Sequence, residues 1–329
     1  MIVLFLGAGF SLPCGVPLAG QLFDEEPQVD RITRARLVQR TVAGWRVWRA
    51  RTGGQPEEYL AHLAAAGDSA GFHGKVWLEA VWYVALRIAL KMGKVESVGS
   101  KPTIVRHTLN RTTQSSIHEG FWDAVFARCP PPTDVSVVTT NYDVLIERGL
   151  RPVPRPRVHR PGFNYGNGRE QLKGGGYPDY THIRPIEAAG TVPVLKLHGS
   201  ISWAIRNGCL TKYHDCRPAI RGDAAIVAPV PGKAVPHWLE PVWTQAQQRL
   251  AAAQHWIVIG YSFPDYDQQV NALAGLAAAH GPRIDVFDPA AQAVACRLRR
   301  LAPTAAIHLH PGLPEASAII KSMELRALS

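Results

Sequence analysis

Polar side chains follow directly after several short apolar runs of this sequence, and their types suit chemistry on a nucleotide or a sugar. The run 135–139 leads into Asn141 and Asp143, and the run 194–197 leads into His198. An amide donates and accepts hydrogen bonds, a carboxylate accepts from ribose hydroxyls, and a histidine can act as a general base near neutral pH. The pattern predicts a site for ribose recognition and proton transfer. Helix N-caps and a satisfied core histidine are the alternative interpretations.

Two later runs end in the same way. Ser262 follows the run 256–260, and Asp288 follows the run 284–287. A serine can bind phosphate or ribose through its hydroxyl and amide, and an aspartate can accept from a ribose or adenine group. Both can equally cap the helices that follow.

A glycine turn follows the first apolar run, 2–6. Its residues are Gly7, Ala8, Gly9, Phe10 and Ser11. Glycines between a strand and a helix let the backbone approach a pyrophosphate and present N–H groups to it. Leu12 stands where the full dinucleotide fingerprint has its third glycine, so a tight turn without a ligand is the alternative.

Continuous apolar runs without alternation are typical of strands buried on both faces of a parallel sheet. Helical patterns alternate with them from about residue 135 onward, which predicts an α/β fold with helices on both faces of the sheet. A region of different, helical character separates the first two strands, so we expect a sheet domain of 1–28 and 131–329 with a helical insertion, 29–130. The expected strands are 2–6, 135–139, 194–197, 225–228, 256–260, 284–287 and 307–310. Two stretches, 151–185 and 207–222, are expected to be poor in regular structure.

Length and composition narrow the class of protein. The chain has 329 residues, a net charge of +10 and a hydrophobic fraction of 46%, so disorder and a coiled coil are poorly supported. Five scattered cysteines do not form a disulfide framework, which predicts a cytoplasmic protein. No segment is long and apolar enough for a membrane span, and the residues after Met1 lack the basic region of a signal peptide.

Taken in chain order, these motifs resemble the sirtuin superfamily. The likeness is narrower to the sirtuin-like NAD hydrolases of bacterial antiphage defence, and it spans nearly the whole chain. It is carried by Gly-Ala-Gly-x-Ser at 7–11, Gly-Val-Pro at 15–17, Thr-Asn-Tyr-Asp at 140–143, His-Gly-Ser at 198–200, a proline-rich segment ending in lysine at 229–233, and Gly-Tyr-Ser-Phe-Pro-Asp at 260–265.

The resemblance implies a Rossmann-like domain that binds NAD as its substrate. It implies that Asn141 positions the ribose or an attacking water and that His198 is the general base. The implied reaction is hydrolysis of NAD to nicotinamide and ADP-ribose. The implied cofactor-binding residues are Gly7, Ala8, Gly9, Ser11, Thr140, Asp143, Gly260, Ser262 and Asp288.

Departures from the deacylase branch of that superfamily favour the hydrolase. The deacylases resemble one another in a zinc ribbon with paired Cys-x-x-Cys, whereas Cys209 and Cys216 lie too far apart in sequence, so no zinc is expected. An NAD-dependent protein deacylase or ADP-ribosyltransferase is the alternative enzyme. A non-catalytic NAD or ADP-ribose binding module is the alternative of another class.

Two arginine-rich segments bear on partners. They can contact nucleic acid, but no known nucleic-acid module accompanies them, and a solvated face is the favoured interpretation. A homo-oligomer and a separately encoded trigger or ATPase partner are further expectations. The arginines are Arg31, Arg34, Arg36, Arg40, Arg46, Arg49 and Arg51 in one segment, and Arg148, Arg151, Arg155, Arg157 and Arg160 in the other.

Overall fold

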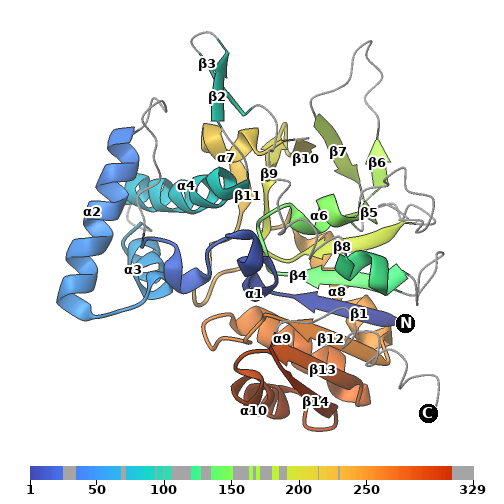
Figure 1. The fold of residues 1–329 in the computed structure, drawn as a ribbon. Helices are drawn as coiled ribbons and strands as arrows, with labels where there is room; N and C mark the ends of the chain where they lie inside the picture. Colours follow the sequence, from blue (N-terminus) through green and yellow to red (C-terminus); the bar gives the residue numbers. More distant parts are fainter. Residues whose placement is uncertain are drawn as a thin grey trace.

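A seven-stranded, wholly parallel sheet forms the centre of the computed structural model (Figure 1). Its strand order is β14-β13-β12-β1-β4-β8-β5. The strands are β1 (Ile2–Leu6), β4 (Val135–Thr139), β5 (Phe163–Asn164), β8 (Val192–Lys196), β12 (His255–Ile259), β13 (Arg283–Asp288) and β14 (Ala306–Pro311). The structure describes residues 1–24, 35–67, 72–92, 95–98, 101–104, 120–126, 135–150, 163–165, 168–170, 180–184, 191–213, 215–228 and 230–312.

Strand β1 lies in the middle of the sheet, between β12 and β4. Every residue of β1, β4, β8 and β12 is buried, as their mostly apolar patterns predict. The chain passes from β1 to β4 on one side and later returns to β12 on the other, so the strand order reverses between β1 and β12. Open α/β sheets bind ligands outside the carboxyl ends of the strands at such a point.

Helices pack against this sheet and complete its core. They are α8 (Glu240–Ala252), α9 (Gln268–Ala277) and α10 (Ala291–Leu301), together with helical residues 120–126. Phe121 of that last segment meets Phe10 edge to face, with ring centroids 5.2 Å apart. The predicted α/β, Rossmann-like class is confirmed by this arrangement.

A second core lies beside the sheet and is built largely by helices between β1 and β4. They are α2 (Ala35–Thr52), α3 (Pro56–Gly67) and α4 (Phe72–Met92), at the left of Figure 1. The rings of Phe23, Trp45, Tyr59 and Tyr83 pack together there with centroid distances between 5.2 and 5.6 Å. The domain bounds 1–28, 131–329 and 29–130 remain a prediction. Within the described residues, no helix is long and apolar enough to cross a membrane.

An antiparallel sheet corrects part of the sequence prediction. Its order is β11-β9-β10-β7-β6, and its strands are β6 (Gly168–Glu170), β7 (Tyr180–Arg184), β9 (Gly199–Arg206), β10 (Cys209–Tyr213) and β11 (Ala224–Ile226). The prediction that 225–228 is a strand of the parallel sheet is wrong, because β11 pairs antiparallel with β9. The stretch 207–222 is not irregular either, since it holds β10 and α7 (Arg217–Arg221), and 151–185 holds β5, β6 and β7.

The turn between β9 and β10 explains part of that error. Asn207 and Gly208 connect the two strands, and both have positive φ, 50° and 76°. Asn-Gly with this backbone is the strongest short-range signal of a hairpin. The local sequence therefore contained the information needed to predict these strands.

Candidate functional site

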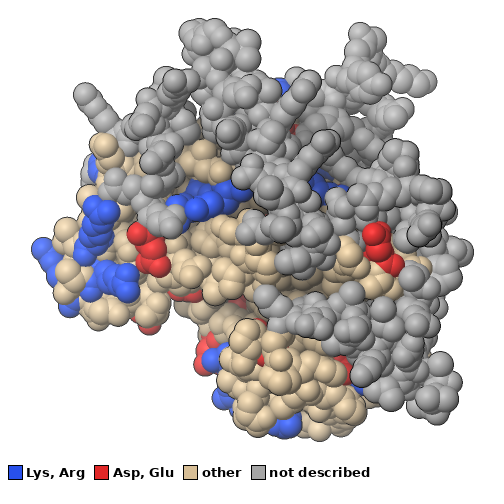
Figure 2. Space-filling model, viewed as in Figure 1, with Lys and Arg blue, Asp and Glu red and all other residues tan. Residues whose placement is uncertain are grey.

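A cavity of about 560 Å³ opens at the carboxyl ends of β1, β4, β8 and β12. Figure 2 shows the surface hollowed between helices α2 and α3 and the lower lobe that contains α10. Nine of the eleven predicted site residues line the cavity: Ala8, Gly9, Thr140, Asn141, Asp143, His198, Gly260, Ser262 and Asp288. Gly7 and Ser11 do not line the cavity; they accept hydrogen bonds from Asn141, which does.

The glycines of the first turn are required for close packing of two backbone segments. A Cβ on Gly7 or on Gly9 would lie under 3.0 Å from Gly260, and a Cβ on Gly260 would lie as close to Gly9 and Phe10. Gly260 also has a φ of +61°, which favours glycine. The turns that follow β1 and β12 therefore touch at the point where the strand order reverses.

Backbone hydrogen bonds occupy the N–H groups of this turn. Gly7 N donates to Ile259 O at 2.9 Å, Gly9 N to Gly260 O at 3.0 Å, and Phe10 N to Gly7 O at 3.0 Å. The N–H groups of Gly7 and Gly9 therefore join the first turn to the end of β12, and that of Phe10 closes the first turn on itself. The glycines thus shape the cavity wall, which is the tight-turn interpretation, and these three N–H groups do not point to a pyrophosphate.

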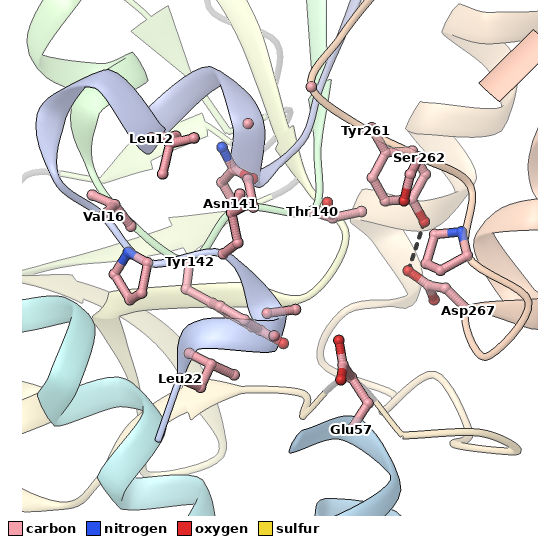
Figure 3. A pocket seen from close by; sticks show the side chains of 18 of the residues that line it. Leu12, Val16, Leu22, Glu57, Thr140, Asn141, Tyr142, Tyr261, Ser262 and Asp267 are labelled. Atoms are coloured by element: carbon pink, nitrogen blue, oxygen red, sulfur yellow. Dashed lines mark hydrogen bonds between the residues drawn. The ribbon is translucent and has the colours of Figure 1, made fainter. Parts of the chain in front are cut away.

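Asn141 is held in one orientation by both protons of its amide. Nδ2 donates to Gly7 O at 2.9 Å and to the hydroxyl oxygen of Ser11 at 3.1 Å. Ser11 in turn donates to Asp143 Oδ2 at 2.7 Å. Among the described residues, Oδ1 of Asn141 has no hydrogen-bond partner, and the residue lines the cavity (Figure 3). Asn141 therefore offers the ligand an acceptor oxygen of fixed direction.

Asp143 performs the capping role that was the alternative to ligand binding. Its Oδ1 accepts from Leu145 N at 2.9 Å, at the start of α6 (Leu145–Gly149). With Ser11 on Oδ2, both carboxylate oxygens are engaged. The fully buried Lys196 donates to the carbonyl of Asp143 and pairs with Glu147 at 3.1 Å. These contacts fix the loop that carries Asn141.

His198 faces a pair of charged residues that the sequence analysis did not predict for the site. Its Nε2 lies 3.0 Å from Lys233 Nζ, and Asp267 Oδ1 lies 3.3 Å from both of these nitrogens. Asp267 Oδ2 accepts from the Tyr261 hydroxyl at 2.8 Å (Figure 3). The side chains of Lys233 and Asp267 are 7% and 2% exposed. This is a compact, nearly enclosed group of ionisable side chains.

Burial and charge shift the pKa values in this group. Burial lowers the pKa of His198, and Lys233 lowers it further, while Asp267 opposes both. Burial also lowers the pKa of Lys233, against the attraction of Asp267. Although burial raises the pKa of Asp267, His198 and Lys233 outweigh it and lower that pKa to about 2. At neutral pH the imidazole is therefore neutral and Asp267 ionised.

The far wall of the cavity comes from the second core. Leu18, Leu22 and Ile88 supply apolar surface, and Glu57 of α3 reaches in from below in Figure 3. Burial first, and then the charge of Glu57, raise the pKa of Tyr266, which also lines the cavity. One side of the cavity is thus polar sheet edge, and the other is apolar with a single carboxylate.

Sequence reasoning missed Glu57, Lys233, Tyr261 and Asp267 as parts of the site. Asp267 carries a weak local signal, since it stands at the N-cap of α9, two residues beyond the motif 260–265. Lys233 ends the proline-rich segment 229–233 that was noted without a role. Nothing local distinguishes Glu57, because only tertiary packing brings α3 to the cavity.

Two further expectations concern metal and nucleic acid. Among the described residues, no group of three His, Cys, Asp or Glu side chains is placed to hold a metal ion. On α2, Arg40 pairs with Glu79 at 2.6 Å and Arg49 pairs with Asp24 at 3.5 Å, both at the surface. Most of the second arginine segment, Arg151, Arg155, Arg157 and Arg160, lies outside the described residues, as do Arg31 and Arg34.

Comparison with known proteins gives structural similarity alone. No protein-family description and no curated protein sequence matches the chain. Among solved structures, a mutant Sir2 homologue in complex with 2'-O-acetyl ADP-ribose is 15% identical, with 99% of this chain and 92% of that chain covered and a TM-score of 0.46. A Sir2 homologue in complex with NAD is 15% identical over 100% and 90% of the two chains, with a TM-score of 0.43.

Proposed function

We propose that the cavity binds NAD and that the protein hydrolyses the bond between nicotinamide and ribose, releasing nicotinamide and ADP-ribose. The observation that carries this proposal is the fixed amide of Asn141, which presents Oδ1 to a cavity that His198 also lines. The cavity lies where the strand order reverses, the usual site of nucleotide binding in such sheets. Its volume of about 560 Å³ lies within the usual range of small-molecule sites.

The charges around the cavity suit this reaction. Among the described residues, its lining includes four carboxylates and neither lysine nor arginine, and Lys233 pairs with one of these carboxylates: they are Glu57, Asp143, Asp267 and Asp288. When the glycosidic bond breaks, its electron pair goes to the nicotinamide nitrogen, and positive charge develops on the ribose. Fixed carboxylates and amide oxygens stabilise such charge in a site shielded from water. A water oxygen then bonds to the ribose carbon and releases a proton.

Asn141 and His198 contribute orientation in this proposal. Asn141 Oδ1 accepts from a ribose hydroxyl or from the attacking water, and His198 binds a ribose hydroxyl. Holding the reacting atoms in place removes much of the entropic cost of the step. At the adenosine end, Asp288 caps Ala290 with Oδ1 at 2.7 Å and has Oδ2 left for a ribose hydroxyl, next to Ser262.

The test is chromatography of the full-length protein incubated with NAD alone. We expect nicotinamide and ADP-ribose from the wild type, and a loss of at least about 10²-fold in Asn141→Ala and His198→Ala. His237→Ala, at an exposed position, is the matched control and should keep the wild-type rate. Release that requires an acyl-lysine peptide or a protein acceptor would favour the deacylase or transferase alternative. Binding of NAD without any release would favour the non-catalytic module.

A role as an effector of antiphage defence is a further part of the proposal, and it rests on the sequence resemblance. Such an effector would deplete NAD on infection, under control of self-assembly or of a separately encoded trigger. The mass of the purified protein in solution tests self-assembly. A strict monomer with full activity would contradict it.

A further inference from the structure

The contact between Lys233 and His198 determines which nitrogen of the imidazole carries the proton. Lys233 Nζ lies 3.0 Å from Nε2 of His198, at hydrogen-bond distance. An ammonium has three donors and no lone pair, so Nε2 must be the acceptor. A proton on Nε2 would leave two donors facing each other at 3.0 Å. The neutral imidazole therefore carries its proton on Nδ1.

Asp267 keeps Lys233 charged in this position. Its Oδ1 lies 3.3 Å from Lys233 Nζ, and both the charge of Asp267 and a side-chain hydrogen bond to it raise the pKa of Lys233, while Oδ2 is engaged with Tyr261. An ammonium has three donors, so Lys233 can contact Asp267 and still donate to His198. A buried ammonium beside an ionised carboxylate remains protonated more readily than one buried alone.

We propose that Lys233 and Asp267 are positioning residues that hold His198 as the neutral Nδ1–H tautomer, so that His198 donates a hydrogen bond to the ligand. Among the described residues, nothing accepts from Nδ1, and His198 lines the cavity. His198 would then be a donor, in place of the general base that the sequence predicted. The catalytic meaning of this tautomer rests on the proposed function, whereas the tautomer itself does not.

The proposed reaction is consistent with a donor at this position. Nicotinamide leaves with the electron pair of the glycosidic bond and needs no proton to do so. The electron-poor ribose carbon accepts water readily, and the proton of that water can pass to solvent. A donor on His198 and an acceptor on Asn141 orient hydroxyl groups and water, and the first step requires no strong base.

The other groups around His198 agree with a neutral imidazole. Tyr142, from the loop after β4, lies with its ring 6.1 Å from that of His198. Tyr261 and Tyr266 interact electrostatically with Asp267, and Glu57 interacts with Tyr266 and Tyr142. Among the described residues, Lys233 is the cation whose charge acts on the ring, and its loss would leave Asp267 as the dominant charge. We then expect the proton to move to Nε2, facing Asp267, and His198 to become easier to protonate.

The direct test is the ¹⁵N–¹H spectrum of the full-length protein labelled on its histidine rings, with His198 assigned through the signals lost in His198→Gln. We expect a protonated Nδ1 and an unprotonated Nε2 at neutral pH, since burial and Lys233 lower the pKa of His198. In Lys233→Met, the proton should move to Nε2 and the imidazolium should appear at a higher pH than in the wild type. Lys75→Met, the same change at an exposed lysine of α4, should behave as wild type. A wild-type proton on Nε2, or an unchanged spectrum in Lys233→Met, would overturn the proposal.

Kinetics provide the second readout. We expect Lys233→Met to lower kcat for nicotinamide release by about 10²-fold with KM nearly unchanged, and to introduce a pH dependence near neutrality. Lys233→Arg retains a cationic donor and should recover much of that loss. A wild-type kcat and pH profile in Lys233→Met, or no recovery in Lys233→Arg, would contradict the positioning role. If the wild type releases no nicotinamide, the proposed function fails, and the spectrum still decides the tautomer.

Discussion

Two buried lysines, Lys196 and Lys233, each lie beside a carboxylate near the same cavity, and they do different things. Lys196 pairs with Glu147 at 3.1 Å and donates to the carbonyl of Asp143, one layer behind the lining. Lys233 pairs with Asp267 at 3.3 Å and contacts the imidazole of His198, which is part of the lining. The first pair contacts backbone and the hydroxyl of Tyr165, whereas the second contacts an imidazole of the cavity lining.

The difference separates a role in stability from a role in chemistry. A buried ion pair that contacts the main chain and a neighbouring hydroxyl fixes the path of a loop. A pair that contacts an imidazole also determines where that ring holds its proton. Loss of Lys196 should therefore appear in unfolding measurements, and loss of Lys233 in the spectrum and pH profile of His198.

The largest effect on stability is expected from Lys196→Met, which removes the ion pair between Lys196 and Glu147. Removing the ammonium leaves Glu147 buried without its partner, at a cost of about 3–5 kcal/mol in the free energy of unfolding. Chemical denaturation measures this loss. The matched control is Lys196→Met with Glu147→Leu, which removes both charges and should recover most of the stability. If the single variant unfolds like wild type, the pair does not stabilise the loop.

Asn141→Asp should lower the rate of nicotinamide release by about 10²–10³-fold with little change in size or shape. A carboxylate cannot donate to Gly7 O and to Ser11, so the acceptor oxygen loses its fixed direction. Steady-state kinetics at neutral pH measure the effect, with the unfolding transition as a check on folding. A rate within threefold of wild type would show that orientation of this amide does not matter.

Gly9→Ala tests whether backbone packing, independent of any charge, shapes the cavity. The added methyl group would lie under 3.0 Å from the backbone of Gly260, which forces the two turns apart. We expect a loss of stability of up to about 3 kcal/mol and weaker NAD binding. Gly120→Ala meets nothing within 4 Å and should be neutral in both measurements. Equal behaviour of the two variants would contradict the packing argument.

The smallest expected effect is the pH dependence of the stability that Asp267, the partner of Lys233, contributes. The pKa of Asp267 is lowered to about 2 from an ordinary value of 3.8, so its contribution is fully present above about pH 4 and is lost as the pH falls through about 2. At about 1.4 kcal/mol per pKa unit, the contribution is about 2 kcal/mol. Urea unfolding of wild type and Asp267→Asn from pH 2 to pH 7 should show a difference that shrinks below pH 4. A constant difference would contradict the pKa shift.

The sequence predicted the parallel sheet well because burial on both faces leaves continuous apolar runs, as in β1, β4 and β12. The sequence also predicted that most of the site residues lie at one edge of the sheet, since the carboxyl ends of parallel strands meet there. The Asn207-Gly208 hairpin was overlooked although its signal is local.

Lys233 and Glu57 could not be predicted from the sequence for a different reason. Their position in the site depends on how a loop and a helix pack against the sheet edge. Neighbouring residues in the chain do not encode that packing in any short pattern. Gly7 and Ser11 were assigned to ligand binding, whereas tertiary contacts place them behind the cavity wall, where they hold Asn141.

A crystal structure of the His198→Ala variant soaked with NAD tests the central claim most directly. We predict a dinucleotide in the cavity, with the nicotinamide ribose next to Asn141 Oδ1 and the adenosine ribose next to Asp288. A nucleotide bound elsewhere, or bound with its adenosine end at Asn141, would contradict the proposed site.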